Sequence, residues 1–215
     1  MKLHLGCGQR YLEGYVNIDY PLSEHSVQQK SVADRFDDLK ELSFEKGSIE
    51  EVRLHHVFEH FSRTTACAFL AGWNSWLAEG GSIRIEVPDF EKTSKVALSK
   101  WSSLKEKSVA IRHIFGSQEA HWAVHYQGYT SLLLSSFVEL YGYKTASIKK
   151  IAYLGTYNIE LFAKKVSSIS KEESDKITAA YLKNFLLDSS PSEMLMLDTW
   201  INEYRLQVCK TFASE

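Results

Sequence analysis

The sequence is poor in cysteine and has no long apolar run. Its three cysteines, Cys7, Cys67 and Cys209, are far apart and form no Cys-x-x-Cys pair, which argues against a disulfide framework and a structural zinc site. We therefore expect a reducing, cytoplasmic environment. No run approaches the roughly 20 apolar residues of a membrane span. A strand expected at residues 2–5 leaves no room for a signal peptide before it.

An excess of charge is also absent. The 215 residues carry 25 basic and 27 acidic side chains, a net charge of −2, so nothing indicates a surface for nucleic acid. The 44% hydrophobic content is enough for one substantial core. We expect one domain over residues 1–168 and a helical C-terminal extension over residues 169–215. The extension could cap the ligand pocket, pack on the domain or pair two chains as a homodimer.

Short β-rich runs alternate with longer helical patterns through most of the chain, which is typical of an α/β fold with a mostly parallel, seven-stranded sheet and flanking helices. Strands are expected at residues 2–5, 16–18, 31–33, 51–55, 82–87, 145–151 and 158–164. Helices are expected at residues 63–78, 90–101, 104–113, 131–141, 172–187 and 193–212. Gly80 and Gly81 are expected to end the first helix.

The first expected strand runs into a glycine turn, Gly6-Cys7-Gly8. Glycine lets the backbone turn tightly and approach a ligand at the carboxyl edge of a sheet. A dinucleotide site would have a third glycine at position 11, which is Tyr11 here. Asp19 ends the second strand, where its carboxylate could accept hydrogen bonds from ribose hydroxyls. A tight turn followed by a surface aspartate is the alternative.

Four stretches together carry a resemblance to a known family: LHLGCGQRYLEGYVNIDY, DDLKELSF, HHVFEHF and LAEGGSIRIEVPDF. In this order they resemble the blocks of class I S-adenosylmethionine-dependent methyltransferases. The resemblance is greatest to a bacterial branch associated with surface-polysaccharide synthesis, and it spans roughly residues 2–165. It implies a Rossmann-like fold, S-adenosylmethionine as cofactor and methyl transfer as the activity.

The resemblance also implies which residues bind the cofactor. Gly6, Cys7 and Gly8 are expected to face the methionine portion, and Asp19 to bind the ribose hydroxyls. Asp38 and Leu39 are expected beside the adenine. His56 and Val57 are expected to close the pocket at the end of the fourth strand. Three features depart from the pattern. His4 replaces a common acidic residue, Glu79 replaces a proline, and the link from Gly8 to the second strand is too short for a full helix.

Methyl transfer to a hydroxyl needs an aligned acceptor and a group that removes a proton. His125 is the preferred general base, because it lies in an expected loop whose His-x-x-Gly-Tyr ending resembles a block of the same branch. His60 and Glu59 follow the fourth strand and are further catalytic candidates. A capping or packing role is the alternative for each histidine.

A metal site is not expected. His56 and His60 could share a helical face, but no third ligand stands at a recognisable spacing. The aromatic residues Trp101, Trp122, Tyr126 and Tyr129 could stack on a sugar ring or belong to the core.

The acceptor is narrowed by motifs that are missing. The Asn/Asp-Pro-Pro-aromatic and Pro-Cys motifs of nucleic-acid methyltransferases are absent after the fourth strand, which leaves a small-molecule or saccharide acceptor. Two alternatives stay open. One is a catalytically inactive protein of this fold that acts as a binding partner in polysaccharide assembly. The other is a nicotinamide or nucleotide-sugar enzyme, against which the missing third glycine and the missing Tyr-x-x-x-Lys pair count.

Overall fold

A seven-stranded sheet organises the chain, with strand order β3-β2-β1-β4-β5-β7-β6. The computed structural model describes residues 1–21, 23 and 30–213. The strands are β1 (Lys2–Leu5), β2 (Val16–Asp19), β3 (Arg35–Phe36), β4 (Ile49–His55), β5 (Leu77–Pro88), β6 (Tyr143–Tyr153) and β7 (Thr156–Lys165). The α-helices are α1 (Arg63–Trp76), α2 (Phe90–Leu98), α3 (Leu104–Phe115), α4 (Ser131–Leu140), α5 (Lys171–Lys183) and α6 (Pro191–Thr211). Two 3-10 helices are η2 (Leu39–Glu41) and η3 (Phe58–His60).

Five strands form a parallel block. β1 pairs with β2 and β4, β2 pairs with β3, and β4 pairs with β5, all in parallel. Leu5, Ile18 and Leu54 are almost completely buried, as expected for strands in the middle of a sheet. All five carboxyl ends therefore meet at one edge, where open α/β sheets bind their ligands.

The other end of the sheet is antiparallel. β7 runs antiparallel to both β5 and β6. The link from β6 to β7 is a tight turn in which Leu154 and Gly155 have φ values of 46° and 84°, the positive values that favour a two-residue hairpin. Because a hairpin reverses the chain, the prediction of a mostly parallel sheet is wrong: the sheet is mixed.

Three expected elements are displaced. The strand expected at residues 31–33 is instead the short β3, which begins at Arg35. The helix expected to reach residue 101 ends at Leu98. The first long helix stops at Trp76, before the two glycines, because the buried Lys165 ammonium donates to the carbonyls of Asn74 and Leu77 at 2.7 and 2.8 Å. β5 begins at Leu77, five residues before the expected strand, and α5 ends at Lys183, four residues before the expected helix end. The other boundaries agree within about two residues, and residues 6–15 contain no helix, as expected.

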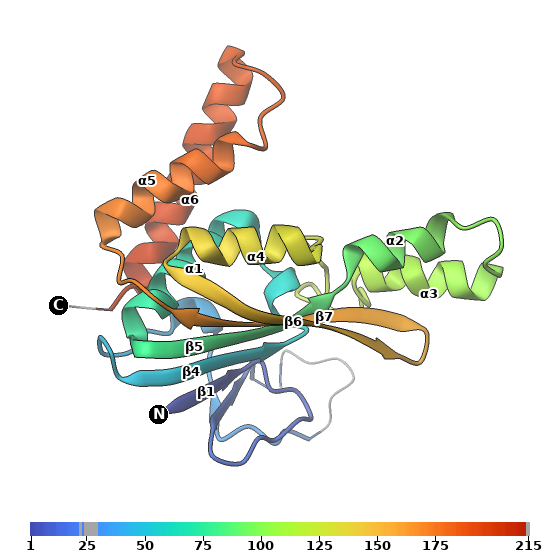
Figure 1. Cartoon of the computed structure of the whole chain (residues 1–215), viewed down its shortest axis with the longest axis horizontal. Coiled ribbons are helices and arrows are strands. Elements are labelled where there is room, and N and C mark those ends of the chain that lie inside the picture. Colours follow the sequence, from blue (N-terminus) through green and yellow to red (C-terminus); the bar gives the residue numbers. More distant parts are fainter. Residues whose placement is uncertain (22, 24–29, 214–215) are drawn as a thin grey trace.

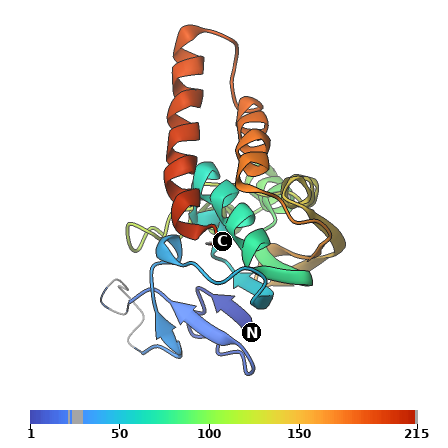
Figure 2. The ribbon, with the colours of Figure 1, turned by 90° about the vertical axis from the view of Figure 1, so that its left-hand side faces the viewer.

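The C-terminal helices share the core of the sheet domain. Trp76 on α1 donates its indole N–H to the carbonyl of Thr211 on α6 at 2.6 Å. A Cβ on Gly72 would lie 2.9 Å from the same oxygen, so the two helices need a glycine at their contact. Tyr204 and Val208 of α6 are fully buried. Figures 1 and 2 show α5 and α6 rising together from α1 on the side of the sheet that also carries α4.

The opposite face of the sheet carries charge. Side chains alternate between faces along a strand, so the partly buried charged residues of β4, β5 and β7 fall on one face. We call them the sheet-face cluster: Arg53, His55, Arg84, Glu86 and Glu160. No helix in the described part of the chain is long and apolar enough to cross a membrane.

Candidate active site in a cleft at the strand ends

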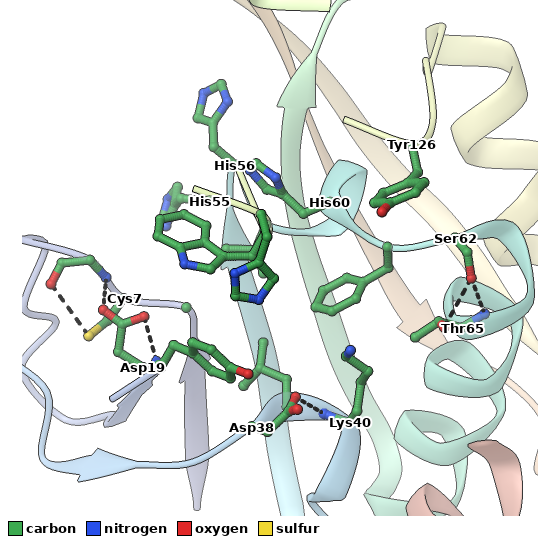
Figure 3. A pocket seen from close by; sticks show the side chains of 18 of the residues that line it. Cys7, Asp19, Asp38, Lys40, His55, His56, His60, Ser62, Thr65 and Tyr126 are labelled. Atoms are coloured by element: carbon green, nitrogen blue, oxygen red, sulfur yellow. Dashed lines mark hydrogen bonds between the residues drawn. The ribbon is translucent and has the colours of Figure 1, made fainter. Parts of the chain in front are cut away.

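A cleft of about 700 Å³ lies at the carboxyl ends of β1, β2 and β4. Figure 3 shows Cys7 and Asp19 on one side of it, Tyr126, Ser62 and Thr65 on the other, and His56 and His60 between them. Its lining residues are Gly6, Cys7, Gly8, Arg10, Asp19, Tyr20, Asp38, Leu39, Lys40, His55, His56, Val57, His60, Phe61, Ser62, Thr65, Glu119, His121, Trp122, Tyr126 and Glu203.

The glycine turn forms one wall. Gly6 and Gly8 have φ values of 66° and 55°, where glycine is favoured. A Cβ on Gly6 would lie 2.4 Å from a methyl carbon of Val57, so only glycine fits against the segment that follows β4. Burial, with a smaller contribution from Asp19, raises the pKa of Cys7 to about 12. The thiol is therefore neutral and is not a nucleophile.

Two carboxylates stand on the same side of the cleft. Asp19 is only 5% exposed and accepts hydrogen bonds from the backbone amides of Gly8 and Tyr20 at 3.0 and 2.8 Å. These bonds fix the position of the carboxylate beside the glycine turn. Asp38 caps η2 by accepting from the amide of Lys40 at 2.9 Å.

The segment after β4 begins with a strained residue. His56 has φ 53°, which is uncommon outside glycine and often accompanies function. Its Nδ1 lies 3.2 Å from Oε1 of Glu59, and its Nε2 lies 3.6 Å from Oε1 of Glu86. Burial acts to lower the pKa of His56, but the two carboxylates outweigh it and raise the pKa to about 9. His56 is therefore a cation near neutral pH.

Glu59 is fully buried beside three histidines. Neither of its carboxylate oxygens has a hydrogen bond of good geometry within the described residues; the short contact to His56 is an ion pair with poor alignment. Burial acts to raise the pKa of Glu59, but His56, His60 and His125 lower it, so the side chain is an anion. His125 Nε2 lies 3.9 Å from Glu59 Oε1, and the rings of His60 and His125 are 4.7 Å apart. We call Glu59, His60 and His125 the cleft cluster.

A loop before α4 brings His125 to this cluster. The amides of Tyr126 and Gln127 donate to the carbonyl of Glu59 at 2.8 and 3.3 Å, which fixes the loop to η3. Gly116 permits the loop to fold back, because a Cβ there would lie 2.4 Å from the carbonyl oxygen of Ala123. Two segments about 65 residues apart in sequence thus meet behind the cleft.

The structure brings together all the residues predicted for cofactor binding, since Gly6, Cys7, Gly8, Asp19, Asp38, Leu39, His56 and Val57 all line the cleft. Of the predicted catalytic residues, His60 lines the cleft, whereas Glu59 and His125 lie behind its wall. Trp122 and Tyr126 line the cleft too. Tyr129 belongs to the core, stacked on Phe58 at 5.5 Å.

Sequence analysis missed several lining residues, among them Arg10, Lys40, His55 and Glu203. Glu203 comes from α6, and only the tertiary structure shows that it reaches the cleft. His4, noted as a departure, lies outside the cleft: it is fully buried, and its ring nitrogens contact Asn17 Oδ1 at 3.0 Å and His55 Nδ1 at 3.1 Å.

The fold is that of class I S-adenosylmethionine-dependent methyltransferases. The chain is similar to the 1,6-didemethyltoxoflavin-N1-methyltransferase of Burkholderia thailandensis, solved with 1,6-didemethyltoxoflavin and S-adenosylhomocysteine (TM-score 0.52, 13% identity, 77% of this chain and 71% of that one). It is also similar to S-adenosylmethionine-dependent methyltransferases from Methanosarcina mazei (0.52, 13%, 77% and 92%) and Mesorhizobium loti (0.52, 10%, 76% and 89%). No protein-family model matches the sequence, and no curated protein matches it.

Proposed function

We propose that this protein transfers the methyl group of S-adenosylmethionine to a hydroxyl of a small molecule or saccharide. The observation that carries the proposal is the cleft at the parallel strand ends. It gathers the glycine turn, Asp19, and the η2 pair Asp38 and Leu39 around one cavity of about 700 Å³. A cavity of this size holds a nucleoside cofactor and leaves room for an acceptor.

The residues fit this cofactor. Gly6 and Gly8 have no side chain that would block a close approach, and the Asp19 carboxylate lines the same cleft, where it would accept hydrogen bonds from ribose hydroxyls. Leu39 offers an apolar contact and Asp38 a polar one for the adenine. The turn contains neither the third glycine nor the helix that a pyrophosphate would need, which favours a cofactor without phosphate. When bound, S-adenosylmethionine supplies an electrophilic methyl group.

The cleft cluster activates the acceptor. His60 faces the cleft, and the buried Glu59 carboxylate behind it stabilises positive charge on the imidazoles. Burial lowers the pKa of His125 more than Glu59 raises it, so His125 is neutral at pH 7 and can take up a proton. A base held next to a fixed carboxylate removes the hydroxyl proton as the methyl group is transferred.

The acceptor enters from the side of the cleft opposite Asp19. Tyr126 lies there (Figure 3) and Trp122 also lines the cleft, and aromatic rings stack readily on sugar rings. These two side chains, together with the sequence resemblance to the polysaccharide-associated branch, support a saccharide acceptor.

Calorimetric titration with S-adenosylhomocysteine tests the cofactor site. We expect micromolar binding that Asp19→Ala reduces at least about tenfold, because the variant removes the ribose acceptor. Asp37→Ala is the matched control, since Asp37 pairs with Arg35 outside the cleft. If binding is absent at millimolar ligand, or if Asp19→Ala binds as tightly as the control, the proposed function is wrong. A positive result justifies screening sugars and nucleotide sugars for S-adenosylhomocysteine release.

A further inference from the structure

The cleft cluster has an arrangement that acid–base chemistry alone does not require. His60 Nδ1 lies 3.1 Å from the carbonyl oxygen of Val124, and His125 Nδ1 lies 3.1 Å from the carbonyl oxygen of His113. A carbonyl oxygen can only accept, so Nδ1 carries the proton in both rings. Each neutral imidazole therefore has its lone pair on Nε2.

Both rings lie close to a carboxylate that has no well-aligned hydrogen-bond donor among the described residues. One nitrogen from each ring and one oxygen of Glu59 lie within 4.8 Å of one another, and His125 Nε2 lies 3.9 Å from Glu59 Oε1. Three electron-pair donors thus converge around one point, and Glu59 is completely buried. Such an arrangement is costly unless a cation lies between the donors.

The sheet-face cluster provides an internal contrast. Its members His55, Glu86 and Glu160 also have donor atoms within 4.8 Å of one another. There, however, Glu160 pairs with Arg84 at 3.2 Å and Arg53 at 3.5 Å, and Glu86 accepts from the amide of Asn158 at 3.0 Å. The carboxylates of that group already pair with arginine cations, whereas the charged partners of Glu59 among the described residues are histidines, His56 at 3.2 Å and His125 at 3.9 Å.

We infer that Glu59, His60 and His125 bind a divalent transition metal ion at the inner end of the cleft. Two imidazoles and one carboxylate suit zinc and its neighbours, and three protein ligands leave a coordination position open for water or substrate. The Nδ1 hydrogen bonds to backbone carbonyls are of the kind that orients histidine ligands around a metal. Sequence analysis considered His56 and His60 and found no third ligand; the fold instead groups His60 with Glu59 and His125.

The distances require only a small adjustment. Bonds of roughly 2.0–2.2 Å in a tetrahedral site place ligand atoms about 3.3–3.6 Å apart, so atoms that now lie up to 4.8 Å apart approach one another by about 1.5 Å at most when the group closes around an ion. The site exists independently of the proposed methyl transfer. Its role rests on that function: a bound metal would lower the pKa of a coordinated acceptor hydroxyl. Because both imidazoles would then bind the ion, the hydroxyl proton would pass to water in place of an imidazole as the methyl group leaves the cofactor sulfur for the oxygen.

Zinc titration of chelator-treated, dialysed protein tests the inference. The full chain carries Cys209→Ser throughout, because the exposed thiol is a competing ligand. We expect one Zn²⁺ per chain by calorimetry, with a rise in melting temperature on addition of the metal. Glu59→Gln and His125→Gln should each weaken binding at least about 100-fold, since loss of a ligand costs more than loss of its supporting hydrogen bond. His121→Gln, which removes a cleft histidine outside the cluster, should leave zinc affinity unchanged.

Two results overturn the inference: no zinc binding by the intact chain, or affinity retained by both Glu59→Gln and His125→Gln. Melting curves without metal show whether each variant is folded. Because two ligand positions are tested, the inference can still be judged if one of the two variants does not fold. Titration of the same samples with S-adenosylhomocysteine separates this test from the proposed function. Zinc binding without S-adenosylhomocysteine binding would support the metal site and contradict the proposed function. S-adenosylhomocysteine binding without zinc binding would contradict the metal site and leave the proposed function standing.

Discussion

The sheet-face cluster and the cleft cluster are both buried groups of histidine and glutamate, but they are built differently. On the sheet face, arginines and an asparagine amide neutralise or hydrogen-bond the carboxylates at 3.0–3.5 Å. In the cleft, Glu59 is more deeply buried and has no hydrogen bond of good geometry with any residue that the structure describes.

The difference separates stability from function. Buried polar groups in proteins are normally satisfied, and those that are not often mark a site that acts on something else. The sheet-face cluster covers a sheet surface that no helix in Figure 1 covers. The cleft cluster keeps electron-pair donors next to a cavity, where they can bind a cation. Four substitutions can break or sharpen this contrast.

The largest effect is expected on catalysis from Glu59→Gln. Removing the carboxylate should lower kcat by about 100-fold or more. The free energy of unfolding without metal should change by less than about 1 kcal/mol, because the substitution breaks no well-formed hydrogen bond and His56 keeps Glu86 as a partner. Steady-state kinetics and urea unfolding of the same samples provide the measurement. An unchanged kcat would remove Glu59 from the catalytic group.

Glu160→Gln should show the opposite pattern. It leaves Arg53 and Arg84 without their shared carboxylate, which should lower the free energy of unfolding by roughly 2 kcal/mol. The loss is smaller than for a fully buried pair, because the arginine side chains are 19% and 24% exposed. Urea unfolding measures the loss, and kcat at low temperature should stay near the original value. Glu50→Gln, on an exposed pair with the N-terminus, is the control and should have no measurable effect. A stable Glu160→Gln protein would mean that the sheet-face cluster is not structural.

His55 predicts an acid-dependent loss of stability. Burial, followed by Arg10, Arg53 and His4, lowers its pKa from 6.5 to about 3. Because the unfolded chain binds a proton near pH 6.5 and the folded chain does not, stability is lost as the pH falls below 6.5. By pH 5 this amounts to about 2 kcal/mol.

Unfolding of the original protein and of His55→Asn between pH 7.5 and 5 measures this slope. The variant should lose less stability on acidification, while the exposed His121→Asn should behave like the original protein. Equal slopes for His55→Asn and the original protein would show that His55 is protonated in the folded state.

The smallest effect is expected at the rim of the cleft. Tyr126 is 59% exposed, so Tyr126→Ala should leave stability unchanged and raise the acceptor KM by roughly fivefold with little change in kcat, as for a group that binds substrate and transition state equally. Tyr153→Ala, at the distant hairpin and 67% exposed, controls for loss of a surface aromatic. A fall in kcat at constant KM would instead place Tyr126 in the chemical step.

Sequence patterns located most elements because their signals are local. The glycine turn needs positive φ at two positions, and the buried strands read as short apolar runs. The limits of α1 were misjudged, because the Lys165 ammonium that binds its last carbonyls is some 90 residues away. The direction of β7 depended on a two-residue turn with leucine at positive φ, a residue that gives no turn signal.

The sequence by itself determined the α/β class, the position of the cleft at the first strand ends, and a set of cofactor-binding candidates that all line it. The tertiary structure alone decided that His125 stands beside Glu59 and His60, that Glu203 of α6 reaches the cleft, and that one buried cluster is neutralised while the other is not. The physical reason is that turns and strands follow from local conformational preferences. The charge state and ligand capacity of a buried group instead depend on which distant atoms surround it.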